Sequence, residues 1–140
     1  MLLFFMKTIL LIGGLEPFGC SGIIQDIKTS SSCNVHSSGI ITAITNQITR
    51  AISPVNVNMI DDQIKSIINK TKVDAVKIGM IYSPEIAETI YKNLKDKNIP
   101  VIIDPVLVSS SGVKLYEDGL LDVLKTKLFS IATIITPNIY

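Results

Sequence analysis

The sequence lacks tryptophan and has one histidine, two cysteines and few aromatic residues, which make up 6% of its 140 residues. The single histidine, His36, cannot by itself form a zinc site, so we expect a structural role for it. No Ser/His/Asp set argues for nucleophilic hydrolysis. Cys20 and Cys33 form neither a CxxC pair nor an even disulfide framework, which predicts reduced thiols and a cytoplasmic protein.

An excess of charge of one sign is also missing, because 13 Lys and Arg face 12 Asp and Glu. No basic cluster with interleaved aromatics is present, which argues against a nucleic-acid or membrane surface and favours a small-molecule partner. No apolar run reaches the roughly 18 residues of a membrane span. The apolar start resembles a signal peptide, but Lys7 interrupts it and no cleavage site follows. Translation from Met1 and translation from Met6 both stay open.

What the chain does have is apolar content, with 47% hydrophobic residues. This suits strands covered by helices on both faces, and it equally suits an incomplete domain with an exposed apolar face. Short β-branched segments alternate with longer segments of helical periodicity, which predicts right-handed βαβ crossovers and a mostly parallel sheet. The predicted strands cover residues 8–12, 33–36, 74–80, 99–103 and 131–135. The predicted helices cover residues 22–32, 61–70, 84–97 and 117–129.

Some boundaries follow from capping signals. Ser21 and Ser83 are predicted N-caps, the second followed by Pro84 at the first helical position, and Asp61 or Asp62 is the predicted cap of the helix between them. The segment 40–48 fits a strand or a helix equally well.

The chain shows no internal repeat and no linker, so residues 1–140 are predicted to belong to one domain. Thr136-Pro137-Asn138 follows the last predicted strand, where a doubly wound fold would return with a covering helix. We therefore expect the N-terminal part of a larger α/β domain. An uncovered sheet edge of this kind predicts self-association.

Ligands of open α/β sheets bind beyond the carboxyl ends of the strands, so polar residues there are candidates for a site. A glycine-rich loop over residues 13–22 joins the first predicted strand to its helix, which suits ligand binding or tight packing equally. Asp104 ends another strand and could hold hydrated Mg²⁺, or could be a turn residue before Pro105. Lys77 lies in an apolar strand, where it is half of a structural ion pair, lies on a strand face near solvent, or is a functional cation.

Two further polar features are ambiguous. The amides of Asn46 and Gln47 can donate and accept hydrogen bonds, as a heteroaromatic ring requires, although such residues are common in loops. Asp26 on the first predicted helix would be an ordinary solvated acid in most proteins.

Taken together, these segments resemble the hydroxymethylpyrimidine/phosphomethylpyrimidine kinases of thiamin biosynthesis, which have a ribokinase-like fold. The most specific matches are Val73-Asp-Ala-Val-Lys-Ile-Gly-Met80 and Ile103-Asp-Pro-Val106. The other matching stretches are Ile12-Gly-Gly-Leu-Glu-Pro-Phe-Gly-Cys-Ser-Gly-Ile-Ile-Gln-Asp-Ile-Lys-Thr29, Ile41-Thr-Ala-Ile-Thr-Asn-Gln-Ile-Thr-Arg50 and Ile134-Ile-Thr-Pro-Asn138.

This resemblance implies ATP-dependent phosphorylation of 4-amino-5-hydroxymethyl-2-methylpyrimidine and then of its monophosphate. It also implies a pyrimidine pocket formed by several residues of this chain. These are Gly14, Asp26, Gln47, Met80 and Val106. Asp104 and Asn138 match positions near the phosphates and Mg²⁺, and no residue of this chain matches the family's catalytic base.

The chain departs from the family in its first loop, which usually reads Gly-Thr-Asp-Pro-Ser-Gly-Gly-Ala-Gly. The replacing residues are Leu15, Glu16, Phe18, Cys20 and Ser21. The family's anion hole, catalytic base and most of its adenine pocket belong to a C-terminal half that has no counterpart here. Since losing one oxyanion donor can cost about 10²–10³ in rate, we expect negligible turnover from these residues alone.

Three interpretations therefore remain. The chain is part of a thiamin-pathway kinase, as a homodimer or with a complementing C-terminal half. Alternatively, it is a non-catalytic module that binds a pyrimidine or mediates assembly. Kinases acting on pyridoxal share the fold, so a vitamin B6 precursor is an alternative substrate.

Overall fold

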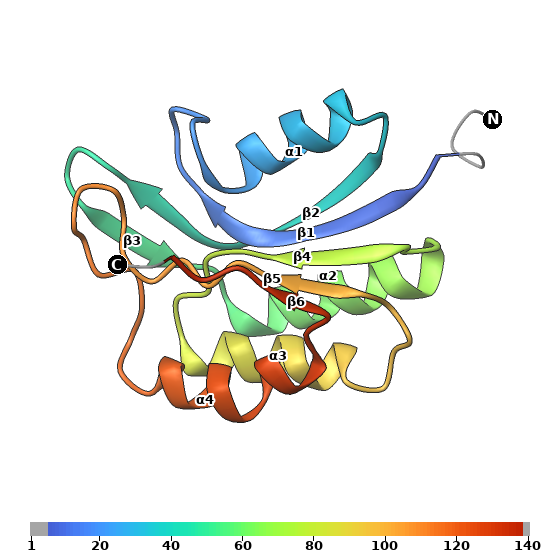
Figure 1. Ribbon diagram of the computed structural model, residues 1–140. Helices are drawn as coiled ribbons and strands as arrows, with labels where there is room; N and C mark the ends of the chain where they lie inside the picture. Colours follow the sequence, from blue (N-terminus) through green and yellow to red (C-terminus); the bar gives the residue numbers. More distant parts are fainter. Residues whose placement is uncertain (1–5, 139–140) are drawn as a thin grey trace.

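The computed structural model describes residues 6–138, which form a six-stranded sheet with helices on both faces (Figure 1). The strand order is β3-β2-β1-β4-β5-β6, and all neighbours are parallel except β2 and β3. The strands are β1 (Thr8–Leu15), β2 (His36–Asn46), β3 (Ala51–Pro54), β4 (Ala75–Ile78), β5 (Val101–Ile103) and β6 (Ile134–Ile135). The helices are α1 (Gly22–Ser32), α2 (Val57–Lys70), α3 (Pro84–Leu94) and α4 (Leu120–Thr126), followed by a 3-10 turn, η2 (Leu128–Ile131). The predicted mostly parallel α/β architecture is confirmed.

The helices are unequally divided between the two faces of the sheet. Helices α2, α3 and α4 lie along one face, whereas α1 alone lies on the other, over β1 and β2 (Figure 1). The main core fills the space between the sheet and α2–α4, where Leu10, Val76 and Ile103 meet Ile64 and Ile90, all fully buried. Among the described residues, no helix covers β4, β5 and β6 on the α1 face.

Several sequence-based boundaries were wrong, for local reasons. Residues 33–36 do not form a strand, because Cys33 and Asn34 close a turn after α1 and β2 begins only at His36. The ambiguous segment 40–48 is strand to Asn46, because Ile40, Ile41 and Ile44 pair with β1 and Ile40 is fully buried. The short antiparallel strand β3 was not predicted.

Helix ends differ as well. Helix α2 begins earlier than predicted, because Asn56 rather than Asp61 or Asp62 is the cap and accepts a hydrogen bond from the Asn58 N–H at 2.9 Å. Ser83 caps α3 as predicted, through the Ile86 N–H at 3.2 Å. Helix α3 ends at Leu94 rather than near residue 97, and the predicted helix 117–129 is a short α4 followed by η2. The strands β4, β5 and β6 are shorter than predicted.

No helix within the described residues is long and apolar enough to cross a bilayer.

Candidate functional site at the carboxyl edge of the sheet

The β1–α1 loop is organised by Glu16, which is buried with only 4% of its surface exposed. Its carboxylate accepts backbone hydrogen bonds from Phe18 and Ser21, both at 2.9 Å, and from Cys20. Burial alone would raise the pKa of Glu16, but these N–H donors together hold the pKa below its usual value. Ser21 is at the N-cap position of α1, yet its side chain makes no capping hydrogen bond. The side-chain cap predicted for Ser21 is therefore absent, and Glu16 instead binds the N–H groups of the loop up to the N-cap residue itself.

Sequence reasoning missed this role of Glu16. A usable signal was present, because an acid between a buried strand and a helix N-terminus can accept from the free N–H groups and complement the helix dipole. The loop depends on glycine at Gly22, whose φ is +61° and whose missing Cβ would strike the Gly14 carbonyl oxygen.

The end of β2 brings Gln47 against this loop. Its side-chain Nε2 donates to Glu16 Oε2 at 3.3 Å, and Thr45 Oγ1 donates to the Leu15 carbonyl at 3.2 Å. Asn46 has a different role, because its Oδ1 accepts from the N–H groups of Ile48 and Thr49 and so closes the turn before β3. Of the two candidate amides, only Gln47 lies in contact with the β1–α1 loop.

Gly14 and Met80 form a closely packed contact between β1 and the segment after β4. A Cβ at Gly14 would come within 2.7 Å of the Met80 sulfur, so glycine is what allows this approach. Thr42 is fully buried and its hydroxyl donates to the Met80 carbonyl at 2.7 Å, which ties this segment to β2. The two predicted pocket residues Gly14 and Met80 are thus in direct proximity.

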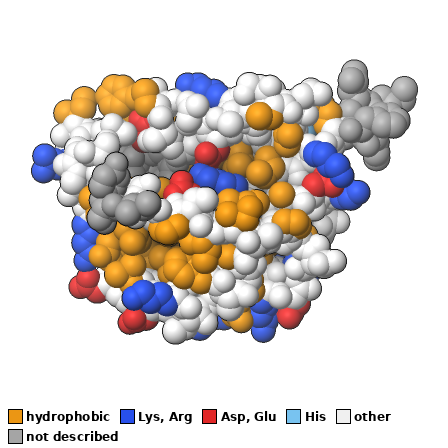
Figure 2. Space-filling model, in the orientation of Figure 1, with side chains coloured by type: hydrophobic (Ala, Val, Ile, Leu, Met, Phe, Trp, Pro, Cys, Tyr) orange, Lys and Arg blue, Asp and Glu red, His pale blue; other side chains and the backbone are white. Residues whose placement is uncertain are grey.

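Asp26 and Lys77 form an ion pair across the open face of the sheet, with Nζ to Oδ2 at 2.7 Å. About a fifth of each side chain is exposed, 23% for Asp26 and 21% for Lys77. The pair joins α1 to β4, which confirms the ion-pair interpretation of Lys77 and shows that Asp26 is not a freely solvated acid. Figure 2 shows basic and acidic side chains in contact near the middle of this face, beside a gathering of hydrophobic ones.

Asp104, Val106 and Asn138 lie where β5 and β6 end. Asp104 and Val106 are half-buried and joined by a backbone hydrogen bond from the Val106 N–H to the Asp104 carbonyl at 2.8 Å. Asn138 is exposed, three residues beyond β6. A hydrogen bond from the Thr136 N–H to the Ile103 carbonyl holds the end of β6 beside β5.

Within residues 6–138, no hydrogen bond or ion pair engages the Asp104 carboxylate, and no group of three or more His, Cys, Asp or Glu could hold a metal ion. One carboxylate beside substrate phosphates is nevertheless a usual arrangement for Mg²⁺.

His36 and the cysteines do not contribute to this edge. His36 begins β2, so it lies at the opposite end of the strands, where its N–H donates to the Lys7 carbonyl. Cys20 and Cys33 are exposed free thiols, as predicted.

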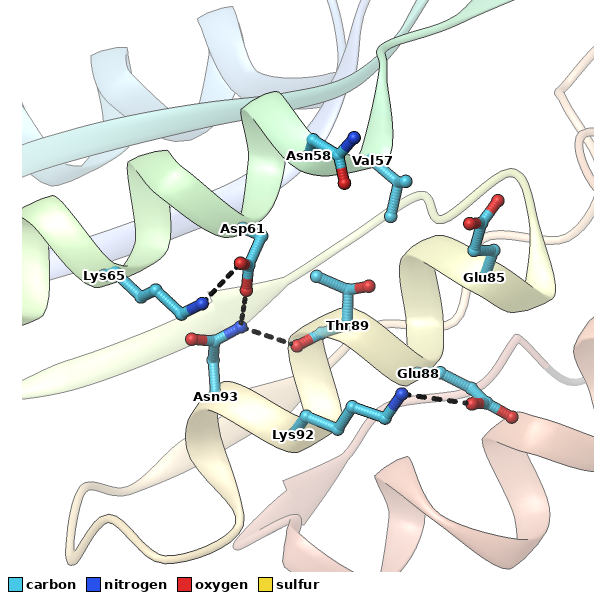
Figure 3. Close-up of a pocket in the computed structure, with 9 residues that line it drawn as sticks. All are labelled: Val57, Asn58, Asp61, Lys65, Glu85, Glu88, Thr89, Lys92 and Asn93. Carbon is cyan, nitrogen blue, oxygen red and sulfur yellow. Dashed lines mark hydrogen bonds and ion pairs between the residues drawn. The ribbon is translucent and has the colours of Figure 1, made fainter.

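Away from this edge, a hollow of about 400 Å³ lies between α2 and α3 on the outer side of the helical layer (Figure 3). The polar side chains that line it mostly bond to one another or to neighbouring side chains. Asp61 accepts from Asn93 Nδ2 at 2.7 Å and from Lys65, and these bonds hold its pKa below the usual range. Glu88 contacts Lys92 at 3.8 Å and Lys127 at 2.7 Å. These contacts show that the hollow is a polar interface between packed helices.

The strand order, the crossover helices and the ligand-type residues at the carboxyl edge define an α/β protein of the ribokinase-like class. Residues 16–140 match the sequence pattern of the family described as phosphomethylpyrimidine kinase, so the chain belongs to that family.

Individual relatives agree with this assignment. The chain is 34% identical over 137 residues to a hydroxymethylpyrimidine/phosphomethylpyrimidine kinase of Staphylococcus aureus, covering 95% of this chain and 50% of the relative. A crystal structure of the phosphomethylpyrimidine kinase of Clostridium difficile matches with a TM-score of 0.86 and 39% identity, over 95% of this chain and 59% of that one. The ADP complex of Bacillus subtilis pyridoxal kinase matches with a TM-score of 0.83 and 30% identity, over 95% and 50%. The chain therefore spans about half the length of these relatives.

Proposed function

We propose that this chain provides the pyrimidine-binding part of an ATP-dependent kinase that phosphorylates 4-amino-5-hydroxymethyl-2-methylpyrimidine and then its monophosphate. The observation that carries the proposal is the family match over residues 16–140, which includes nearly all of the residues at the carboxyl edge of the sheet. The S. aureus relative of the same family is named for both hydroxymethylpyrimidine and phosphomethylpyrimidine.

In this proposal each residue has a physical task. Gly14 has no side chain, so its backbone can contact a planar ring directly beside Met80, and Gln47 hydrogen-bonds to the ring's polar edge. The Asp26 carboxylate, held by Lys77, supplies a fixed acceptor on the α1 side, and Val106 contributes apolar surface. These groups bind and orient the substrate. Such positioning supplies much of the rate enhancement in phosphoryl transfer.

Asp104 and Asn138 are the residues that we propose to lie nearest the phosphates of ATP and Mg²⁺. When bound, ATP supplies the transferred phosphoryl group and Mg²⁺ neutralises its negative charge. The Asp104 carboxylate fits a hydrated Mg²⁺ because it is half-buried and has acceptor capacity to spare. The similar pyridoxal kinase of B. subtilis forms a complex with ADP, which supports nucleotide binding by a kinase of this fold.

The catalytic base and anion hole implied by the family resemblance have no counterpart in this chain, so we propose that turnover requires a complementing C-terminal half. The uncovered β4–β6 face supports such a partner. Ile134 is 53% exposed there although it belongs to a strand, and burying it would be favourable. A homodimer through the same face is the alternative. The exposed free thiols fit a reducing cytoplasm, which we propose as the location.

Titration calorimetry of the purified chain with hydroxymethylpyrimidine, with and without Mg-ATP, tests the proposal. We expect saturable binding of the pyrimidine and tighter binding than of pyridoxal, the substrate of the alternative kinase. Gly14→Val is the matched negative control, because its side chain would collide with Met80. Absence of heat from a chain that circular dichroism shows to be folded would refute the pocket and leave an assembly role.

A further inference from the structure

The contact between Glu16 and Gln47 carries an inference about substrate selection, which rests on the function proposed above. We propose that Glu16 is a positioning residue that fixes which end of the Gln47 amide faces the substrate. The site thereby prefers a ring bearing an amino group over an otherwise identical ring bearing a carbonyl.

The direction of this hydrogen bond follows from the chemistry of the two groups. A carboxylate can only accept, so the Gln47 amide must turn its NH₂ end toward Glu16 Oε2, 3.3 Å away. The oxygen and nitrogen branch from the amide carbon in different directions, so the Gln47 oxygen does not point toward Glu16 when the nitrogen bonds to it. Since Gln47 is exposed, that oxygen is available to a ligand as an acceptor.

The charge of Glu16 is secured by its surroundings. Three backbone N–H groups of one short loop, from Phe18, Cys20 and Ser21, converge on its carboxylate. Although burial opposes ionisation, these donors lower the pKa of Glu16, so it remains a carboxylate at neutral pH. The acceptor that orients Gln47 is thus ionised throughout the physiological range.

The position of this acceptor is also well defined. Lys28 Nζ donates to the Gly19 carbonyl at 2.9 Å and fastens the loop to α1. On the other side, the Asn46 side chain closes the turn that carries Gln47. A flexible glutamine adopts either amide orientation in water, whereas here one orientation gains a charge-assisted hydrogen bond.

The consequence for recognition is a preference by donor and acceptor pattern. An exocyclic amino group donates to the outward oxygen of Gln47, whereas a carbonyl in the same place would face another acceptor. A site whose polar group loses its partner discriminates strongly against the unmatched ligand. Glu16 thereby sets the acceptor that matches the 4-amino group of the proposed substrate.

Glu16→Gln is the decisive variant, because it keeps the size of the side chain and exchanges one acceptor for a donor. The new amide keeps its oxygen toward the N–H groups of Cys20 and Ser21, which bond to Oε1 of Glu16, and turns its NH₂ toward Gln47. The Phe18 N–H, which bonds to Oε2, loses its acceptor in this variant. The Gln47 amide then reverses and presents its NH₂ to the ligand. We expect the ratio of dissociation constants for 5-hydroxymethyl-2-methylpyrimidin-4-one and its 4-amino counterpart to fall by about tenfold, as one mismatched hydrogen bond implies.

The double variant Glu16→Gln with Gln47→Glu provides the rescue. It exchanges donor and acceptor within the pair, so the outward group is again an acceptor and we expect the amino preference to return. Glu117→Gln changes an exposed acid in the loop before α4 and should leave the ratio unchanged. Both ligands are measured by calorimetry on every variant, after circular dichroism has shown that it is folded.

If Glu16→Gln does not fold, an NMR measurement on a chain with unaltered Glu16 still tests the inference. In side-chain amide NMR spectra of the unaltered chain, the Gln47 resonance, identified by its loss in Gln47→Met, should shift as acid protonates Glu16. The exposed Gln63 on α2 serves as the internal control.

The outcomes separate this inference from the proposed function. A lowered ratio in Glu16→Gln that returns in the double variant supports it, as does a Gln47 resonance that follows Glu16. An unchanged ratio, equal weakening of both ligands, or a Gln47 resonance that behaves like Gln63 overturns it alone. If the unaltered chain binds neither ring, the proposed function fails and this inference fails with it.

Discussion

Replacing Gly22 with alanine should disrupt the β1–α1 loop more than the same change at another glycine with positive φ. Gly22 has φ of +61°, and its added Cβ would collide with the carbonyl oxygen of Gly14. Gly112 is the matched control, because its φ is +80° but a Cβ there meets nothing within 4 Å. Both substitutions impose a left-handed backbone on alanine, and only Gly22→Ala adds a steric clash.

The expected losses of stability follow from the left-handed backbone and from the steric clash. A left-handed alanine costs about 1–2 kcal/mol, which is the whole effect expected for Gly112→Ala. Forcing an added methyl into a packed site costs about 1–3 kcal/mol more, so Gly22→Ala should lower the free energy of unfolding by about 2–5 kcal/mol.

Urea denaturation followed by circular dichroism measures both variants, with similar m-values as a check that the same unfolding is compared. Because the displaced atom belongs to Gly14, pyrimidine binding should also weaken in Gly22→Ala and remain unchanged in Gly112→Ala. Equal destabilisation by the two substitutions would refute the argument, since it would mean that the loop moves aside at no cost.

Two other predictions concern charged groups. The folded-state pKa of Glu16 lies below its ordinary value of 4.5, so its contribution to stability is present above that pH and is lost as pH falls through the folded pKa. Glu16→Gln should therefore flatten the stability curve from urea titrations on the acid side of pH 4.5; a curve that stays parallel to that of the unaltered chain would contradict this. Lys77→Met removes the partner of Asp26 and should cost about 1–2 kcal/mol, less than for a fully buried pair because about a fifth of each side chain is exposed. Adding Asp26→Asn should recover part of that loss in thermal unfolding, and additive losses would argue against a coupled pair.

Much of the fold could be predicted from local patterns. The alternation of β-branched and helical segments predicts parallel crossovers because each amphipathic helix must cover the strands beside it. The capping signal Ser83-Pro84 placed the start of α3 correctly because capping involves only neighbouring residues. By contrast, β3 and the extent of β2 depend on pairing with distant strands, and the periodicity of residues 40–48 did not decide between helix and strand.

The candidate site likewise combines residues that the sequence indicated with contacts that only the folded chain brings together. Position along the chain already placed Gly14, Met80 and Asp104 at strand ends, whereas Gln47 lay in the undecided segment 40–48, and the resemblance gave all four their predicted roles. Glu16 entered the sequence argument only as a departure from the family's loop. Its backbone donors lie in its own loop, where a local signal was available, but Gln47 Nε2 reaches it from 31 positions away, a contact that no local pattern encodes.

The sequence by itself thus determined the class of fold, the family and the edge of the sheet where chemistry would occur, because periodicity, capping and motifs are local properties. Only the tertiary structure decided the partners of the charged groups: Lys77 with Asp26, 51 positions apart, and Glu16 with the N–H groups of its own loop and with Gln47. The physical reason is that a half-buried charge must find a counter-charge or hydrogen-bond donors, and which one it finds depends on the packing of α1 against the sheet.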